Sequence, residues 1–405
     1  MAYSRFAAIA ALRHRNFRLY WIGVVVSVIG WQLQFLGVGW LVYRITGSPL
    51  FLGLVGLFTA APTIALTLVG GVIADRMNRL HLLKITQATS GVSSFILATL
   101  TATGTVQIWH VLLLAAVNGT VQAFDTPARQ ALLPDLVEKE DLLNAVALSS
   151  AAWQVARVVG PALAGALIAI FGEAICFYTT SIGYGVMLLM LTWIKISARK
   201  TMTERQNVWR NLVGGLVFVA RTPLFAIIIG LTCTNSLFGM SYNTLMPAFA
   251  RDILHAGARG YGLLMTAGGV GAIIGSFVLA TWGARVRRSS LLMAGPILFG
   301  SLLVAFASSR NFNVSIAIIA AVGLANTMYM VTGQSILQAE VPNDLRGRVM
   351  GLYGLTWSLM PLGGMLGGTV ATFAGEQITV GLSGLIVACF AIYIFVTFPQ
   401  IRRLT

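Results

Sequence analysis

Long apolar runs recur along the whole chain, and they constrain its fold more than any other feature. Each run holds about twenty residues or more, which is enough for a helix to cross the hydrocarbon core of a bilayer. Because 57% of the 405 residues are hydrophobic and only 10% are charged, a water-soluble fold would leave too much apolar surface exposed. A membrane β-barrel would show short alternating segments instead. We therefore predict an all-α polytopic membrane protein with about twelve transmembrane helices, near residues 17–43, 50–74, 80–103, 108–130, 142–171, 174–194, 223–249, 260–283, 289–308, 312–338, 343–372 and 377–398.

Basic residues are distributed unequally between the two sides of this arrangement. The chain carries 27 Lys and Arg against 12 Asp and Glu, a formal net charge of +15. Nearly all of the basic residues lie on one predicted side; the exceptions are Arg44, Arg251, Arg259, Arg310 and the intramembrane Arg157. Because cytoplasmic loops collect Lys and Arg, we expect both termini in the cytoplasm. The basic excess thus predicts topology and not a nucleic-acid partner.

Cysteine and histidine do not form a pattern typical of catalysis or metal binding. Cys176, Cys233 and Cys389 each stand alone in an apolar run, which favours packing over a disulfide or a metal site. The histidines lie near predicted span ends, and no Walker-type phosphate loop is present. We expect no cofactor, no metal and no enzymatic activity.

A polar stretch near residues 195–211 divides the predicted spans into six and six. We predict an N-terminal six-helix bundle over residues 1–195, a cytoplasmic linker over 196–222 and a C-terminal six-helix bundle over 223–405. In the linker, Trp209–Arg221 could lie on the membrane surface as an amphipathic helix.

The two halves also resemble each other in sequence. Gln130–Pro134 and an acidic loop precede a span that contains Gly160–Gly165. In the second half, Gln334–Gln338 and a polar loop precede a span that contains Pro361–Gly368. Gly- and Pro-rich spans can look alike through composition alone, but the polar loops match as well, which favours duplication. Such repeats place a substrate cavity near the bilayer midplane, where the halves meet.

A short charged turn joins the second and third predicted spans. It reads Gly71-Val72-Ile73-Ala74-Asp75-Arg76-Met77-Asn78-Arg79. In its glycine, its acid and its two arginines, this segment resembles the loop signature of the major facilitator superfamily of membrane transporters, Gly-x-x-x-Asp-Arg/Lys-x-Gly-Arg/Lys. Asn78 stands where the family has Gly. Because Asn tolerates positive φ better than other non-glycine residues, we expect the turn to keep its shape.

Three further segments resemble the branch of that superfamily that contains the bacterial enterobactin exporter and related secretion proteins. They are Leu12–Arg18, Gly39–Pro49 and Phe124–Gln130. The resemblance implies the major facilitator fold, with two pseudo-symmetric six-helix bundles in a protein that we expect to be a monomer. It also implies a multi-pass location in the bacterial inner membrane, and it says little about the substrate.

The resemblance further implies a gating role for the charged turn. The predicted gating residues are Gly71, Asp75, Arg76 and Arg79. The Asp75 carboxylate could sit against the N-terminus of the eleventh span, where unpaired amides favour negative charge. Arg76 and Arg79 could pair with Asp125 or with acids of the following loop, or they could only set topology. The predicted cytoplasmic charge network is Asp125, Arg129, Asp344 and Arg348.

The fourth span carries a polar stripe. Asn118, Gln122, Asp125 and Arg129 recur at steps that place them on one helical face. Asp125 and Arg129 are one turn apart, so we expect them to pair. Asn118 and Gln122 lie deeper, where each could line a cavity or bond to a neighbouring helix. Family members often carry an Arg in this span, but Ala115 occupies the matching position here, so the usual proton-linked arginine is missing from that site.

Arg157 lies in the middle of the fifth span, one turn after Gln154 and one turn before Pro161. A charge at this depth costs roughly 3 kcal/mol on insertion scales, so it needs a partner, water or a ligand. No acid occurs at a comparable depth in the predicted topology, and we expect Arg157 to bind substrate or to take part in coupling. A fixed ion pair is the alternative.

Other residues of the central spans are candidates to line the cavity or to act as a hinge. Aromatic rings and amides would suit a fairly large, amphiphilic, ring-containing substrate. Further substrate or coupling candidates are Gln34, Trp31, Asn235, Tyr242 and Asn326. The predicted hinge residues are Gly160, Pro161, Gly165 and Pro361, for which plain helix packing is the alternative.

These features predict a secondary active transporter that works by alternating access in the lipid bilayer. We expect it to export a small amphiphilic molecule, such as a siderophore, a secreted metabolite or a drug-like compound, in exchange for protons. Because the acids cluster near span ends, a uniporter or a substrate-gradient exchanger stays open. Import of a small metabolite and lysophospholipid flipping are the alternative functions.

Overall fold

The computed structural model describes residues 7–195, 216–283 and 287–398. Within these ranges, the side chains of Leu68, Val72, Ala74, Asp75, Arg76 and Asp344 are not described. Most of the predicted amphipathic helix Trp209–Arg221 lies outside the described residues, and its last part, 216–221, is helical.

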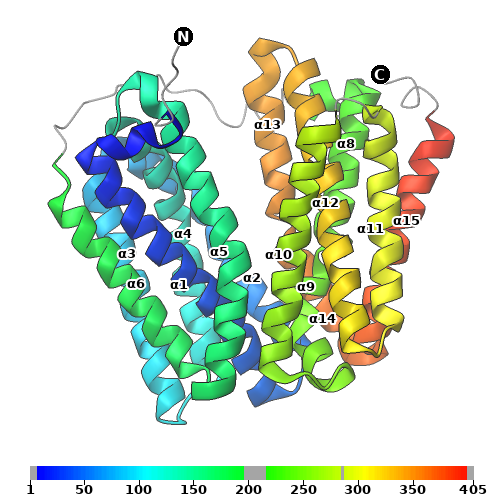
Figure 1. Ribbon diagram of the computed structural model, residues 1–405, viewed down its shortest axis with the longest axis horizontal. Helices are drawn as coiled ribbons and strands as arrows, with labels where there is room; N and C mark the ends of the chain where they lie inside the picture. Colours follow the sequence, from blue (N-terminus) through cyan, green and yellow to red (C-terminus); the bar gives the residue numbers. More distant parts are fainter. Residues whose placement is uncertain (1–6, 196–215, 284–286, 399–405) are drawn as a thin grey trace. The chain divides into compact units, whose positions relative to one another are not determined.

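Six long helices make up the first half of the chain, in the order in which Figure 1 colours them from blue to green. A short 3₁₀ helix, η1 (Ala7–Arg13), precedes them. Their ends agree with the predicted spans to within a few residues. The helices are α1 (Arg15–Thr46), α2 (Pro49–Arg76), α3 (Arg79–Ala102), α4 (Ile108–Leu132), α5 (Leu142–Phe171) and α6 (Ala174–Trp193).

The second half contains six further spans, and two of them, the seventh and the eleventh, are each divided into more than one helix. Its helices are α8 (Pro223–Thr234), α9 (Ser241–Ala248), α10 (Gly257–Trp282), α11 (Arg288–Ser308), α12 (Phe312–Glu340), α13 (Asn343–Trp357), α14 (Met360–Ala374) and α15 (Glu376–Thr397). A π-helical segment, η4 (Asn235–Gly239), interrupts the seventh span between α8 and α9, and a second one, η5 (Phe249–Ile253), ends it. The eleventh span breaks between α13 and α14, directly before Pro361, which lacks the amide hydrogen that a continuous helix would use.

Ten of these segments are long and apolar enough to cross a membrane. The helices α3 and α4 have similar lengths, 24 and 25 residues, but are not among the ten. Their polar side chains explain the difference: α3 buries Thr86, Gln87 and three serines, and α4 carries the predicted polar stripe. The polar atoms of α3 and α4 bond largely within the protein, so these helices need not be as apolar as the others. The all-α polytopic fold is confirmed.

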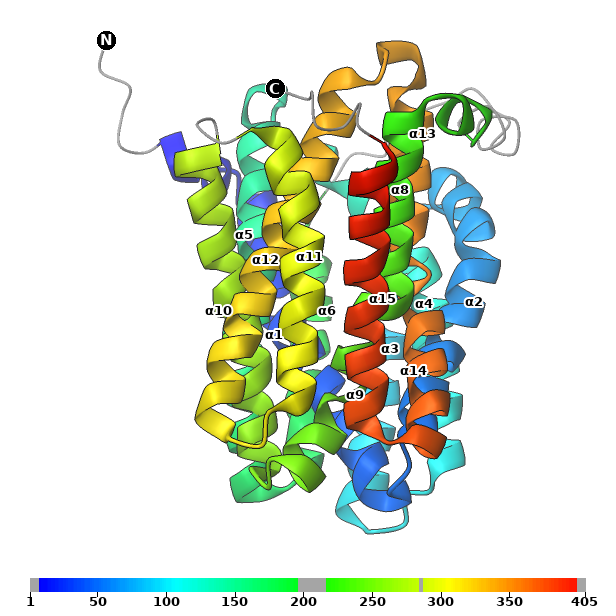
Figure 2. The same cartoon turned by 90° about the vertical axis from the view of Figure 1, so that its right-hand side faces the viewer.

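The helices group into two units, which are described separately. The first contains residues 1–46 and 58–203, and the second contains 47–57 and 204–405, so α2 contributes its first residues to the second unit. In the first unit, α1 packs on α5 and α6, and α3 packs on α4 and α6. In the second, the seventh span packs on α14 and α15, and α11 packs on α12 and α15, as Figure 2 shows. The ninth and twelfth spans thus repeat the pairing of the third and sixth, as pseudo-symmetric bundles require.

Glycines permit close helix contacts at matching places in both units. A Cβ atom on Gly119 of α4 would lie 2.8 Å from the carbonyl carbon of Thr59 in α2. On Gly275 of α10, a Cβ atom would lie 2.7 Å from the carbonyl oxygen of Leu324 in α12. The second and fourth spans therefore approach each other as the eighth and tenth do.

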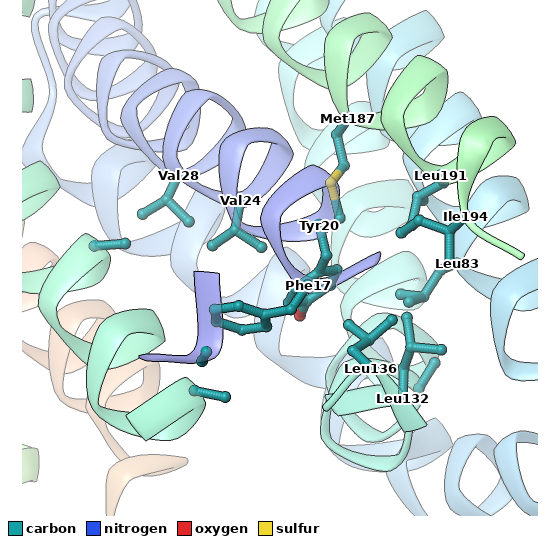
Figure 3. Packing of buried hydrophobic residues seen from close by; sticks show 14 of the residues in the cluster. Phe17, Tyr20, Val24, Val28, Leu83, Leu132, Leu136, Met187, Leu191 and Ile194 are labelled. Carbon is teal, nitrogen blue, oxygen red and sulfur yellow. The ribbon is translucent and has the colours of Figure 1, made fainter. Parts of the chain in front are cut away.

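An apolar cluster fixes the ends of α1, α3 and α6 in the first unit. Phe17, Leu83 and Met187 are fully buried in it, and Figure 3 shows them with Leu132 and Leu191 around the start of α1. Close packing of these side chains fixes the ends of the three helices relative to one another within this unit.

Candidate functional site

The turn between α2 and α3 places the predicted gating loop. Gly71 lies inside α2, and Asp75 and Arg76 occupy its last turn, with side chains outside the described part of the chain. Asn78 has φ −62° and ψ 113°, so the turn does not use the positive φ that Asn tolerates. Its Oδ1 atom instead accepts hydrogen bonds from the amides of Leu80 and His81, at 3.0 and 3.3 Å. Asn78 is the N-cap of α3, a position at which Asn is among the preferred residues.

Arg79 joins the start of α3 to the end of α4. One guanidinium nitrogen donates to the carbonyl oxygen of Ala131 at 2.9 Å and to Oδ2 of Asp135 at 2.8 Å. Both charged side chains are about four-fifths buried, with 20% and 22% exposed. The predicted pairing of Arg79 with an acid of the following loop is confirmed, and the guanidinium also satisfies a carbonyl at the C-terminal end of α4.

A second polar centre surrounds Asp125 in α4. Its carboxylate accepts hydrogen bonds from Thr86 Oγ1 at 2.8 Å and from Gln87 Nε2 at 2.7 Å, both on α3. It also forms the predicted ion pair with Arg129, one turn further along α4. The buried Tyr20 of α1 interacts electrostatically with this pair. Asp125 therefore connects α3 and α4 through hydrogen bonds that apolar packing alone would not supply.

Contacts of Asp141 and Glu173 with basic residues of the first unit were not predicted from the sequence. His14 Nε2 lies 2.8 Å from Oδ2 of Asp141, and the Ala11 amide donates to Asn144 Oδ1 at 2.9 Å, so η1 is attached to the start of α5. At the far end of α1, Arg44 Nε lies 2.7 Å from Oε1 of Glu173. In each case residues more than a hundred positions apart meet, and helical periodicity gives no signal for such pairs.

Arg157 lies at the middle of α5 on an exposed face, with Gln154 exposed one turn before it. Among the described residues, none forms a hydrogen bond or an ion pair with Arg157. The fixed ion pair considered as the alternative is therefore absent from the described part of the chain. Beside Arg157, one turn before it on the same helix, Trp153 is 44% exposed.

Aromatic rings from α1 lie next to Trp153. The ring centroids of Trp31 and Trp153 are 5.6 Å apart at 67°, an edge-to-face contact. Trp31 also stacks on Phe35, with centroids 5.8 Å apart and planes at 21°. The sequence indicated Trp31 but not Trp153 or Phe35. Their i, i+4 relations, Trp153 to Arg157 and Trp31 to Phe35, were the signal that could have found them.

The predicted hinge residues of α5 lie at its contact with α1. Gly160, Pro161 and Gly165 are all buried. A Cβ atom on Gly160 would lie 2.5 Å from the Cβ atom of Gln32, so only glycine permits this separation of the two helices. The packing interpretation thus fits these residues directly, and the hinge stays a prediction.

Of the three predicted cavity amides in the first unit, Gln34 and Asn118 form hydrogen bonds and Gln122 is exposed. Gln34 Oε1 accepts a hydrogen bond from Ser94 Oγ at 2.7 Å, which ties α1 to α3. Asn118 is half-buried and donates to the Leu114 carbonyl of its own helix at 2.9 Å. Gln122 is exposed on α4. Of these three, Gln122 has the side chain most available to a ligand.

The candidates in the second unit are buried. Asn235 is 0% exposed, and its Nδ2 donates to Asn326 Oδ1 at 3.3 Å. Tyr242 is 8% exposed and contacts Phe299 edge-on, with centroids 6.5 Å apart. All three side chains are buried in this structure, and Asn235 lies in the π-helical segment η4. Their role in lining the substrate cavity stays a prediction. Pro361 is half-buried at the start of α14, Arg348 is exposed, and the Asp344 side chain lies outside the described part.

Comparison with known proteins assigns the family. The family model for transmembrane secretion effectors, a branch of the major facilitator superfamily, matches residues 6–404. The chain belongs to this family. Members of the family are membrane transporters and not enzymes, so this chain is a multi-pass membrane transporter of small molecules.

Several bacterial relatives of this transporter cover nearly its whole length. It is 24% identical to the staphyloferrin A transporter of Staphylococcus aureus, over 89% of this chain and 90% of the relative. It is 25% identical to the multidrug efflux pump Tap of Mycolicibacterium fortuitum, over 90% and 91%. It is 23% identical to macrolide efflux protein A of Streptococcus pyogenes, over 93% and 94%.

Solved structures of other transporters share its fold. A mutant of the nucleoside transporter NupG superposes with a TM-score of 0.77 at 12% identity, over 95% of this chain and all of that one. A bacterial homologue of the human lysosomal transporter Spinster, in an inward-facing and occupied conformation, gives 0.76 at 13% identity, over 96% and 98%. At these identities the likeness shows the major facilitator fold alone.

Proposed function

We propose that this transporter exports small amphiphilic molecules, such as siderophores, secreted metabolites or drug-like compounds, by alternating access. The observation that carries the proposal is Arg157, a charge at the middle of α5 that is exposed and has no partner among the described residues. An arginine in this position is costly against lipid, so its face must meet water or a ligand. The three efflux and siderophore-type relatives favour export over import.

The same face offers groups for an amphiphilic ligand. Trp31 and Trp153 present large apolar rings, and Gln154 and Arg157 present hydrogen-bond donors. Gln122 of α4 adds an exposed amide elsewhere in the first unit. This mixture of apolar area with a few polar groups is typical of sites for drug-sized molecules.

Gating and coupling complete the proposal. Gly71, Asp75, Arg76 and Arg79 are the proposed gating residues at the cytoplasmic face. Asp125, Arg129, Asp344 and Arg348 are the proposed charge network, in which Asp125 joins α3 to α4. The proton gradient is the proposed energy source, because the membrane potential alone supplies about 2.3 kcal/mol per charge per 100 mV. We also propose that both termini are cytoplasmic and that the monomer is the working form.

Expression in a bacterial host stripped of its main efflux pumps tests this function. The cells are challenged with a panel of antibiotics that includes a macrolide, and their medium is searched for excreted siderophores. We expect protection or excretion with the wild type, its loss with Arg157→Ala, and its collapse when a protonophore is added. The matched control is Arg310→Gln, which removes an exposed arginine from the loop between α11 and α12.

The outcomes separate the alternatives. Greater sensitivity or uptake with the wild-type gene would indicate import and overturn the proposal. Transport that resists the protonophore would replace proton exchange with uniport or substrate exchange. Activity of Arg157→Ala equal to that of Arg310→Gln would reject the role of Arg157.

A further inference from the structure

The face that carries Arg157 also specifies the kind of molecule that it binds. We infer that Trp31, Trp153 and Arg157 form a binding site for an organic anion that contains a flat ring. The ring would lie against the indoles, and the acidic group would pair with the guanidinium. This inference rests on the proposed function and adds the chemical class of its substrate.

The aromatic part of the site is held by close packing. Trp31, Phe35 and Trp153 are 37%, 42% and 44% exposed, so the rings contact one another and still leave part of their surface accessible. Behind them, Gly160 of α5 meets Gln32 of α1, which is 8% exposed. This close contact between α1 and α5 lies near Trp31 and Trp153 in sequence, and it fixes the distance between the two helices that carry the rings. Rigid indoles bind flat rings at a low cost in conformational entropy.

The charge of the site is positive and uncompensated. Neither α1 nor α5 contains an Asp or Glu, and none of the described residues pairs with Arg157. A cationic ligand would meet repulsion there. A carboxylate, sulfonate or phosphate would meet a planar guanidinium that can donate two parallel hydrogen bonds. Gln154, one turn before Arg157, adds an amide donor to the same face.

The geometry also argues against a lipid-facing role for these rings. Trp153 and Arg157 are one turn apart, so they share a face of α5, and a face with an arginine at mid-helix is not compatible with hydrocarbon. The exposed apolar residues of α6, such as Ile182, show what a face without any charge looks like.

Three naphthalene probes of one size test the inference. They are 2-naphthoate, which is anionic, 2-naphthalenemethanol, which is neutral, and 2-naphthylmethylammonium, which is cationic. Binding of each to the purified full-length transporter in lipid nanodiscs is measured by isothermal titration calorimetry. We expect the anion to bind at least about tenfold more tightly than the other two, as a charge-assisted hydrogen-bond pair provides.

Four variants assign the preference to residues. Arg157→Gln should remove the preference for the anion while leaving weak binding of all three probes, and Arg157→Lys should retain part of it. Trp153→Leu should weaken all three probes alike, and Arg310→Gln should change nothing. Elution as a single peak on size-exclusion chromatography confirms that each variant is folded.

Three results would overturn the inference: equal binding of the probes, tighter binding of the cation, or no binding of any probe. An anion preference that survives Arg157→Gln would overturn it as well. Failure here is distinct from failure of the proposed function, because the export assay uses other compounds. If the protein exports compounds but shows no preference for the anionic probe, only the inference about the substrate class is rejected. If it prefers the anionic probe but exports nothing, only the proposed export function is rejected.

Discussion

Replacing Gly119 by alanine should separate α2 from α4 in the first unit. The new Cβ atom would lie 2.8 Å from the carbonyl carbon of Thr59 and 3.0 Å from its Cα atom. Carbon atoms in good contact are about 3.5 Å apart, and the Thr59 carbonyl oxygen would lie closer still to the new Cβ atom, so the helices must part by more than about 0.7 Å. Both neighbours are backbone atoms that cannot rotate away. The hydrogen bond from Thr63 Oγ1 to the Gly119 carbonyl, at 2.8 Å, crosses the same contact and would lengthen.

The expected loss of stability follows from these contacts. Overpacking of this kind costs about 1–3 kcal/mol, and a weakened hydrogen bond adds about 1 kcal/mol. Replacing glycine by alanine within a helix stabilises the helix by about 1 kcal/mol, which offsets part of this loss. We therefore expect Gly119→Ala to destabilise the protein by about 2 kcal/mol, in line with these terms.

Thermal unfolding of the purified transporter, followed by tryptophan fluorescence, measures this effect. The matched control is Gly185→Ala on α6, where a Cβ atom would meet nothing within 4 Å, and which should unfold at or above the wild-type temperature. Gly275→Ala, at the matching contact of the second unit, should also be less stable. A Gly119→Ala protein as stable as the Gly185→Ala protein would refute the close α2–α4 contact.

Three further substitutions test the loops and the charged centres. Asn78→Ala should lose about 1 kcal/mol of stability in thermal unfolding because α3 loses its cap, whereas Asn78→Ser should stay near the wild type; equal losses would argue against capping. Asp125→Asn should lower the free energy of unfolding by about 3 kcal/mol because Arg129 is left without its partner. Adding Arg129→Gln should recover part of this loss. Additive losses in a double-mutant cycle would mean that the pair contributes nothing to stability. Asp75→Asn should reduce export while the protein still folds and inserts, and unchanged transport rates in proteoliposomes would reject its gating role.

The positions of the helices and the contacts within a single helix could be predicted from the sequence. Apolar runs are long and their breaks are short, so span ends such as those of α5 could be predicted closely. The Asp125–Arg129 pair also follows from helical spacing. The conformation of Asn78 did not follow, because capping depends on where the next helix begins.

Contacts between distant helices could not be derived from one sequence. Trp31 and Trp153 meet because Gly160 lets α5 approach α1, which no local pattern indicates. Asn235 was expected to line the cavity, but in this structure it is fully buried within the π-helical segment η4, where it donates a hydrogen bond to Asn326. A π-helix arises from tertiary packing more than from local propensity, so the side on which this amide lies depends on the whole bundle.

Labelling of single cysteines tests most directly whether the Arg157 face lies along an aqueous path. In a protein whose Cys176, Cys233 and Cys389 are replaced by serine, Gln154→Cys is treated with a membrane-impermeant maleimide in right-side-out and in inverted vesicles. The control is Ile182→Cys, which is 66% exposed on an apolar face of α6. We predict labelling of Gln154→Cys from both sides, with vesicles that stay closed to the reagent, and no labelling of Ile182→Cys. A Gln154→Cys protein that resists the maleimide from both sides, or vesicles that leak it, would contradict alternating access along this face.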